Sequence, residues 1–184
     1  MRRVTTLLGL LLILAFATGT AEAQTRFSVE AGPLIPYGDF ADAVDGSAWI
    51  GARAEYQGVN ALGQVAKLGL VVQTGYADLE LDTESDADAS LFAIGAGVRV
   101  YSAALPFFLH GGVEYITTDI EFDVPGVGPV DESSDSFGPT LGAGFDFPLG
   151  AVFIEVEGRL HMGLGGDGVD PRFTTLTAAL GLPF

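Results

Sequence analysis

The chain has 184 residues and contains no cysteine, which excludes disulfides, thiolate metal sites and cysteine nucleophiles. Its formal net charge is −16, so nucleic acids and other anionic surfaces are unfavourable partners. Apolar residues make up 48% of the chain, yet beyond its start no segment has the apolar length of a spanning helix, about 20 residues.

The first 23 residues have the three parts of a secretory signal peptide. Arg2 and Arg3 form a basic start, an apolar run covers residues 7–17, and Ala21-Glu22-Ala23 is a small-x-small cleavage pattern. The apolar run is too short for a retained anchor, which needs about 20 residues. We therefore expect a signal peptide over residues 1–23 and one mature domain over residues 24–184.

Eight segments of the mature chain alternate apolar and polar residues with a period of two, as β-strands do. In the seventh segment, for example, Ile154 and Val156 lie on one face and Glu155 and Glu157 on the other. Each segment is near or above the roughly 9–11 residues that a tilted membrane strand needs. The segments are 26–36, 47–56, 65–77, 90–101, 107–118, 137–147, 152–162 and 173–184.

Alternation alone does not distinguish a membrane barrel from a soluble sheet, because the two differ only in which face is buried. Glycine favours the barrel, since the polar faces also carry most of the glycines, among them Gly51, Gly75 and Gly97. Small residues on those faces leave room for Trp49 and for large charged side chains inside a narrow barrel. We therefore predict an all-β, eight-stranded antiparallel up-and-down transmembrane β-barrel with its charged faces inward.

The connections between these segments alternate in length. Short gaps are expected at residues 57–64, 102–106 and 148–151, and longer loops at 37–46, 78–89, 119–136 and 163–172. This alternation is typical of outer-membrane barrels and predicts that both termini lie in the periplasm. Aromatic residues near the segment ends are expected to form two girdles. Pro139 predicts a later start for the sixth strand, because proline removes a ladder donor.

In these features the chain resembles the small eight-stranded outer-membrane barrels related to the OmpA transmembrane domain, OmpX and OmpW. The resemblance rests on Ala21-Glu22-Ala23, on the stretch GPLIPYGDF at residues 32–40, on inward Arg and Glu residues, and on the terminal Phe184. It implies a monomer in the outer membrane of a Gram-negative-type bacterium, surrounded by outer-membrane lipid and without a cofactor. It also implies that Phe184 is the assembly signal read by the barrel-insertion machinery.

The candidate site is the set of charged residues on the predicted inward faces. Charges enclosed in this way must pair with one another. The set comprises Arg53, Glu55, Lys67, Arg99, Glu114, Asp146, Glu155, Glu157 and Arg159. We interpret it as a structural plug of salt bridges that fills a barrel too narrow for a channel.

The predicted function is a structural or surface-interaction role without catalysis. The alternatives are a narrow pore or conduit for small ions or small hydrophobic molecules, a lipid A-modifying enzyme, and a secreted soluble barrel that binds a ligand inside. His110 and His161 also face inward, but the strand around His161 offers no serine nucleophile, so no catalytic residue is predicted.

An acidic residue occupies nearly every second position of residues 78–88. Clustered carboxylates suit Ca²⁺ or Mg²⁺, but this run lacks the glycine-turned spacing of an EF-hand loop. We therefore interpret it as a solvated loop and predict no metal site.

Overall fold

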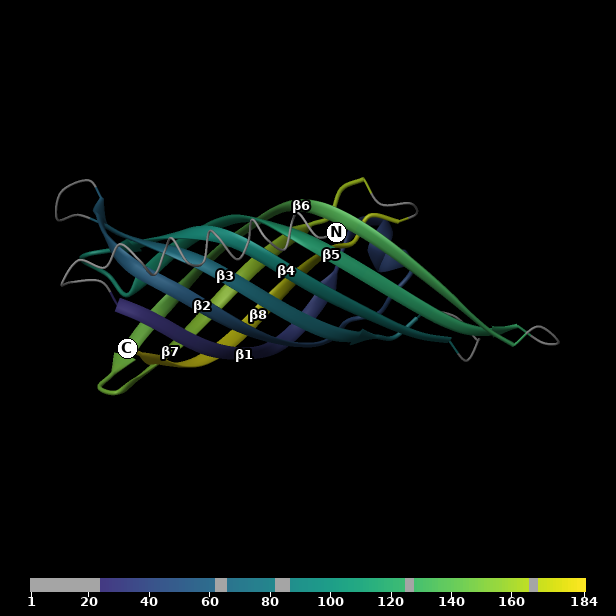
Figure 1. The fold of residues 1–184 in the computed structure, drawn as a ribbon, viewed down its shortest axis with the longest axis horizontal. Helices are drawn as coiled ribbons and strands as arrows, with labels where there is room; N and C mark the ends of the chain where they lie inside the picture. Colours follow the sequence, from purple (N-terminus) through teal and green to yellow (C-terminus); the bar gives the residue numbers. More distant parts are fainter. Residues whose placement is uncertain (1–23, 62–65, 82–86, 125–127, 166–168) are drawn as a thin grey trace.

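Eight antiparallel strands close into a barrel in the residues that the computed structural model describes, which are 24–61, 66–81, 87–124, 128–165 and 169–184. Each strand pairs with its neighbours in sequence, and β1 pairs with β8 to complete the barrel (Figure 1). The strands are β1 (Gln24–Pro36), β2 (Ser47–Ala61), β3 (Ala66–Leu79), β4 (Ala87–Ser102), β5 (Phe107–Val124), β6 (Gly128–Leu149), β7 (Val152–Met162) and β8 (Arg172–Pro183). The predicted all-β up-and-down architecture is confirmed, and the predicted signal peptide lies outside the described residues.

The prediction of a long loop at residues 119–136 was wrong. Residues 119–124 and 128–136 form the outer parts of β5 and β6, which remain paired as far as Val124 and Gly128. They extend beyond the other strands at the right of Figure 1. Gly128 has φ 102° at the hairpin tip, a backbone conformation that glycine adopts readily. Backbone pairing needs no apolar side chains, so an Asp-, Gly- and Pro-rich composition did not prevent strand formation.

The prediction that Pro139 delays the sixth strand was also wrong. β6 begins at Gly128, and Pro139 lies inside it opposite Val113 of β5. The regular ladder between β6 and β7 begins only at Thr140, next to this proline. The missing N–H of Pro139 therefore lies where β6 separates from β7.

The outer surface of the barrel carries large exposed apolar side chains, such as Leu141 and Leu180, which are 54% and 55% exposed. Aromatic residues gather near its two ends. Tyr115 lies beside Phe137 toward the long hairpin, at what we refer to as the loop end. At the opposite or terminal end, the rings of Phe27 and Phe184 lie 5.8 Å apart. The outer surface is thus an apolar band with aromatic residues at both margins.

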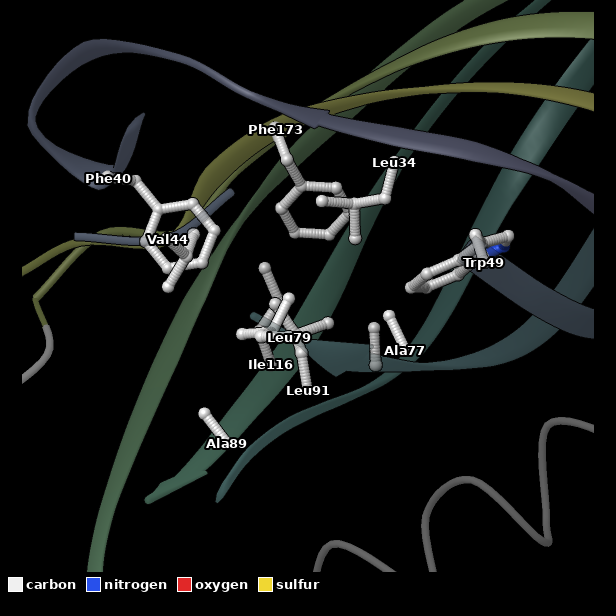
Figure 2. Close-up of a cluster of buried hydrophobic side chains, with 11 residues drawn as sticks. Leu34, Phe40, Val44, Trp49, Ala77, Leu79, Ala89, Leu91, Ile116 and Phe173 are labelled. Atoms are coloured by element: carbon white, nitrogen blue, oxygen red, sulfur yellow. The ribbon is translucent and has the colours of Figure 1, made fainter. Parts of the chain in front are cut away.

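An apolar cap fills the interior at the loop end (Figure 2). The short 3₁₀ helix η1 (Gly38–Asp42) in the β1–β2 connection places Phe40 over the barrel mouth, where its ring lies 6.4 Å from that of Phe173. No helix among the described residues is long and apolar enough to cross a membrane. The cap consists of Leu34, Phe40, Val44, Trp49, Ala77, Leu79, Ala89, Leu91, Ala93, Ile116 and Phe173.

Trp49 reaches this cap because β3 has a glycine, Gly75, diagonally across from it, one inward position away from its direct partner Ala77. A Cβ atom on Gly75 would lie 1.9 Å from Cζ2 of Trp49, so any larger residue would displace the indole. An inward glycine here makes room for a large inward side chain, as the sequence predicts.

Candidate functional site

Charged side chains fill the interior between the apolar cap and the terminal end. Most are almost completely buried, and Arg99 has no exposed surface. We refer to this set as the ionic layer: Arg26, Glu30, Arg53, Glu55, Arg99, His110, Asp146, Glu155, Glu157 and Arg159.

Glu157 of β7 is the hub of the ionic layer. Its carboxylate accepts hydrogen bonds from Arg53 Nη1 at 2.9 Å and from Arg159 Nη2 at 2.7 Å, and it also pairs with Arg99. Nδ1 of His110 lies 2.9 Å from the same carboxylate. These partners come from β2, β7, β4 and β5, so their contacts cross the lumen and tie opposite walls together.

Glu30 of β1 joins the hub to the apolar cap. Arg159 binds its two carboxylate oxygens with both terminal nitrogens, each at 3.1 Å. Trp49 donates its indole N–H to Glu30 at 3.1 Å, and Arg53 contributes a bond at 3.3 Å. A buried carboxylate needs such complete pairing, since an unpaired buried charge is strongly destabilising.

Arg26 closes the terminal end of the ionic layer. It binds Asp146 with two bonds of 2.7 and 2.9 Å, and its guanidinium carbon lies 3.5 Å from the centre of the Phe153 ring. Arg26 is not among the residues that the sequence predicts for the interior. Its parity with Ser28 and Glu30 places it on the inward face and could have identified it.

The structure places the residues predicted for the interior inside the barrel with one clear exception. Lys67 is exposed near the start of β3, so its prediction as an interior residue was wrong. It lies beside Tyr101 at the terminal end, where a long side chain can carry its ammonium group out to solvent. Asp146 is partly buried, with 17% of its side chain exposed, while Glu55 and Glu155 are buried.

Glu114 lies apart from the ionic layer and is paired with His161. Nδ1 of His161 is 2.8 Å from the Glu114 carboxylate, and Nε2 is 3.1 Å from the hydroxyl of Thr175. A hydroxyl, an imidazole and a carboxylate in series also occur in hydrolases. Here Thr175 and His161 have no exposed surface, so a substrate cannot reach the hydroxyl in this conformation. In this conformation the trio can share a proton.

The acidic run at residues 78–88 lies partly on the outer surface near the loop end, and its residues 82–86 lie outside the described residues. Carboxylates from β3 to β6 line a groove of about 760 Å³ there, and they belong to Asp78, Glu80, Asp88, Asp119, Glu121 and Glu132. In the described part of the chain, no three His, Asp or Glu side chains are grouped closely enough to hold a metal ion.

A closed barrel with an apolar exterior and an enclosed charged interior is the architecture of membrane-spanning β-barrels. The chain belongs to the family described as outer membrane protein beta-barrel domain, which matches residues 8–184. The resemblance to small outer-membrane barrels is thereby confirmed, and membership places the protein in the outer membrane of a Gram-negative-type bacterium.

Solved structures of outer-membrane barrels have the same fold. Neisserial surface protein A is 15% identical with a TM-score of 0.57, covering 90% of this chain and 99% of that chain. The Yersinia pestis attachment invasion locus protein Ail, in complex with the heparin analogue sucrose octasulfate, is 16% identical with a TM-score of 0.57, covering 89% and 99%. A major outer membrane protein from Thermus thermophilus is 12% identical with a TM-score of 0.59, covering 89% and 100%. These likenesses show the fold alone, and no curated protein matches the chain.

Proposed function

We propose that this protein is a closed outer-membrane barrel with a structural or surface-interaction role and without catalytic or transport activity. The observation that carries the proposal is the hub at Glu157, whose partners come from β2, β4, β5 and β7. In the described part of the chain, a buried network of paired charges spans the lumen, and we infer that it blocks the passage of ions. The apolar cap provides a second seal at the loop end.

One observation supports the absence of catalysis, and a second bears on the kind of partner. The hydroxyl of Thr175 is enclosed beside His161, so the trio that resembles a hydrolase site has no access to substrate. The groove near the loop end is lined by carboxylates. With both termini in the periplasm, this groove faces the exterior and repels polyanions such as the heparin analogue bound to Ail.

Conductance in planar lipid bilayers tests the closed barrel. We expect the folded wild-type protein to give no defined current steps. A variant that carries Arg99→Ser and Glu157→Ser in the ionic layer and Phe40→Ala in the apolar cap weakens both seals, and if folded it should conduct. Defined steps from the wild-type protein would instead favour the narrow pore.

Phe184 is proposed to be the assembly signal. In the folded barrel its backbone pairs with Thr25 through bonds of 2.7 and 3.1 Å, but its side chain is 72% exposed. We expect Phe184→Ala to lower the amount of barrel assembled in cells while leaving the purified protein able to refold. Phe147→Ala, which removes another exposed aromatic ring, is the control. Equal amounts in the outer membrane for both variants and wild type would refute the assignment.

A further inference from the structure

The pair formed by Glu114 and His161 lies between the ionic layer and the apolar cap. In the described part of the chain, His161 is the only side chain in hydrogen-bond or ion-pair contact with Glu114. The four arginines of the ionic layer are buried, and every carboxylate that they contact is one other than Glu114. Arg26 contacts Asp146 and Glu155, while Arg53, Arg99 and Arg159 all contact Glu157. The imidazole of His161 is therefore the group that can balance the negative charge of Glu114.

The groups around His161 come from the adjacent strand β8 and, across the lumen, from β5 and β2. β5 supplies Glu114, and β8 supplies Thr175 and Phe173, while β2 supplies Trp49. Other ionic groups in the interior are already paired. Arg159, which lies on the same strand as His161, binds Glu30 of β1 and Glu157. His110 of β5 also binds Glu157. The inward side chains that β6 contributes beside His161 are those of Ser136 and Thr140, which carry hydroxyl groups.

Thr175 allows His161 to exist with or without its second proton. Beside a cationic imidazole, the Thr175 oxygen accepts a bond from Nε2–H. Beside a neutral one, the hydroxyl donates to Nε2. The imidazole is satisfied in both states, so the cost of losing the proton falls on Glu114, which remains as a buried anion without a counter-charge.

Water is the available partner for that anion. Ser136 and Thr140 flank Gly138, which is directly opposite Glu114 in the β5–β6 ladder. The hydroxyl oxygens of both residues are buried and have no hydrogen-bond partner in the described part of the chain. An entering water would therefore meet polar groups as well as the carboxylate.

The same imidazole supports the cap from below. The His161 ring stacks on Phe173 at 4.3 Å and 11°, and its centre lies 5.6 Å from that of Trp49. Phe173 in turn faces Phe40 of η1, as Figure 2 shows. A shift of His161 to admit water disturbs the stack on which η1 rests.

We propose that Glu114 and His161 act as a proton-operated latch: the single proton they share keeps the apolar cap dry, and its loss at higher pH lets water in and loosens η1. At lower pH the pair holds one proton and is neutral overall, on whichever group that proton resides. Raising the pH removes it and leaves net negative charge beneath the cap. This latch goes beyond the proposed function, since the cap can open while the ionic layer stays closed.

Trp49 reports the state of the cap, because it is the only tryptophan in the chain and is 2% exposed. Acrylamide quenching of its fluorescence is measured on the protein in lipid vesicles at about pH 6 and about pH 9. We expect the quenching constant to rise severalfold at the higher pH, with the emission shifted to longer wavelength. Emission intensity is not used, since a protonated imidazole itself quenches a neighbouring indole.

Three variants separate the latch from other causes. Glu114→Gln removes the carboxylate, so quenching should be low at both pH values. His161→Asn leaves Glu114 without a cation and removes the ring that stacks on Phe173, so at the higher pH quenching should be at least as high as in the wild type. His110→Gln changes the other buried histidine and should keep the wild-type rise. No rise in the wild type, a wild-type rise in Glu114→Gln, or low quenching at both pH values in His161→Asn would each overturn the proposal.

Discussion

Replacing Arg159 with methionine is expected to lower the free energy of unfolding by about 3–5 kcal/mol, the cost of removing one partner from a buried ion pair. The guanidinium of Arg159 binds Glu30 and Glu157, and its side chain is only 1% exposed. Methionine fills much of the same space but supplies no charge and no donor. The two carboxylates would then share too few cations in an interior that water does not reach.

The measurement is urea unfolding of the barrel in lipid vesicles. Arg172→Met is the matched control, because Arg172 is 44% exposed and its pair with Asp170 spans 3.5 Å. An exposed pair of this kind contributes about 0–1 kcal/mol. If both variants unfolded like the wild type, the carboxylates of the ionic layer would have to be hydrated or protonated, and the closed-barrel proposal would lose its support.

Replacing Leu141 with arginine is expected to cost about 2–4 kcal/mol of unfolding free energy, the penalty for a cation on the lipid face at the bilayer midplane. Leu141 points outward from β6, midway between Phe137 near the loop end and Phe145 toward the terminal end. At this depth the guanidinium cannot easily reach either interface.

Leu149→Arg on the same strand is the control for this prediction. Leu149 is 57% exposed and Leu141 is 54% exposed, so the two sites differ in depth rather than in exposure. Leu149 is the last residue of β6, where a charge near the interface costs about 0–1 kcal/mol. Equal costs at the two sites would mean that the apolar band does not face hydrocarbon.

The candidate site was only partly predictable from the sequence. The parity of Arg53, Glu155 and Arg159 placed them on inward faces, but parity does not say how far along the lumen a side chain ends. Lys67 shares the inward parity of Gly69 and Gln73, yet it lies near the start of β3, at the terminal end of the barrel, and is exposed to solvent. Arg26 is the opposite case. It also lies near a strand end, but its side chain is buried because it folds back onto Phe153 and Asp146.

The apolar cap was not predicted because it depends on a loop. The sequence around Phe40 predicts a connection rich in Gly and Asp, and the packing of Phe40 on Phe173 joins residues far apart in the chain. The long β5–β6 hairpin was missed for a related reason. Its side chains carry little periodic apolar signal, and its strands are held by backbone pairs between β5 and β6.

The sequence by itself determined the strand class, the order of the strands and which face of each turns inward, because period-two alternation and the parity of glycine are local properties of the chain. Only the tertiary structure decided which charges meet. Glu157 pairs with Arg53 across 104 residues, with Arg99 across 58 and with His110 across 47. Closure of the barrel sets these contacts, since it fixes the stagger of strands that are not neighbours in sequence.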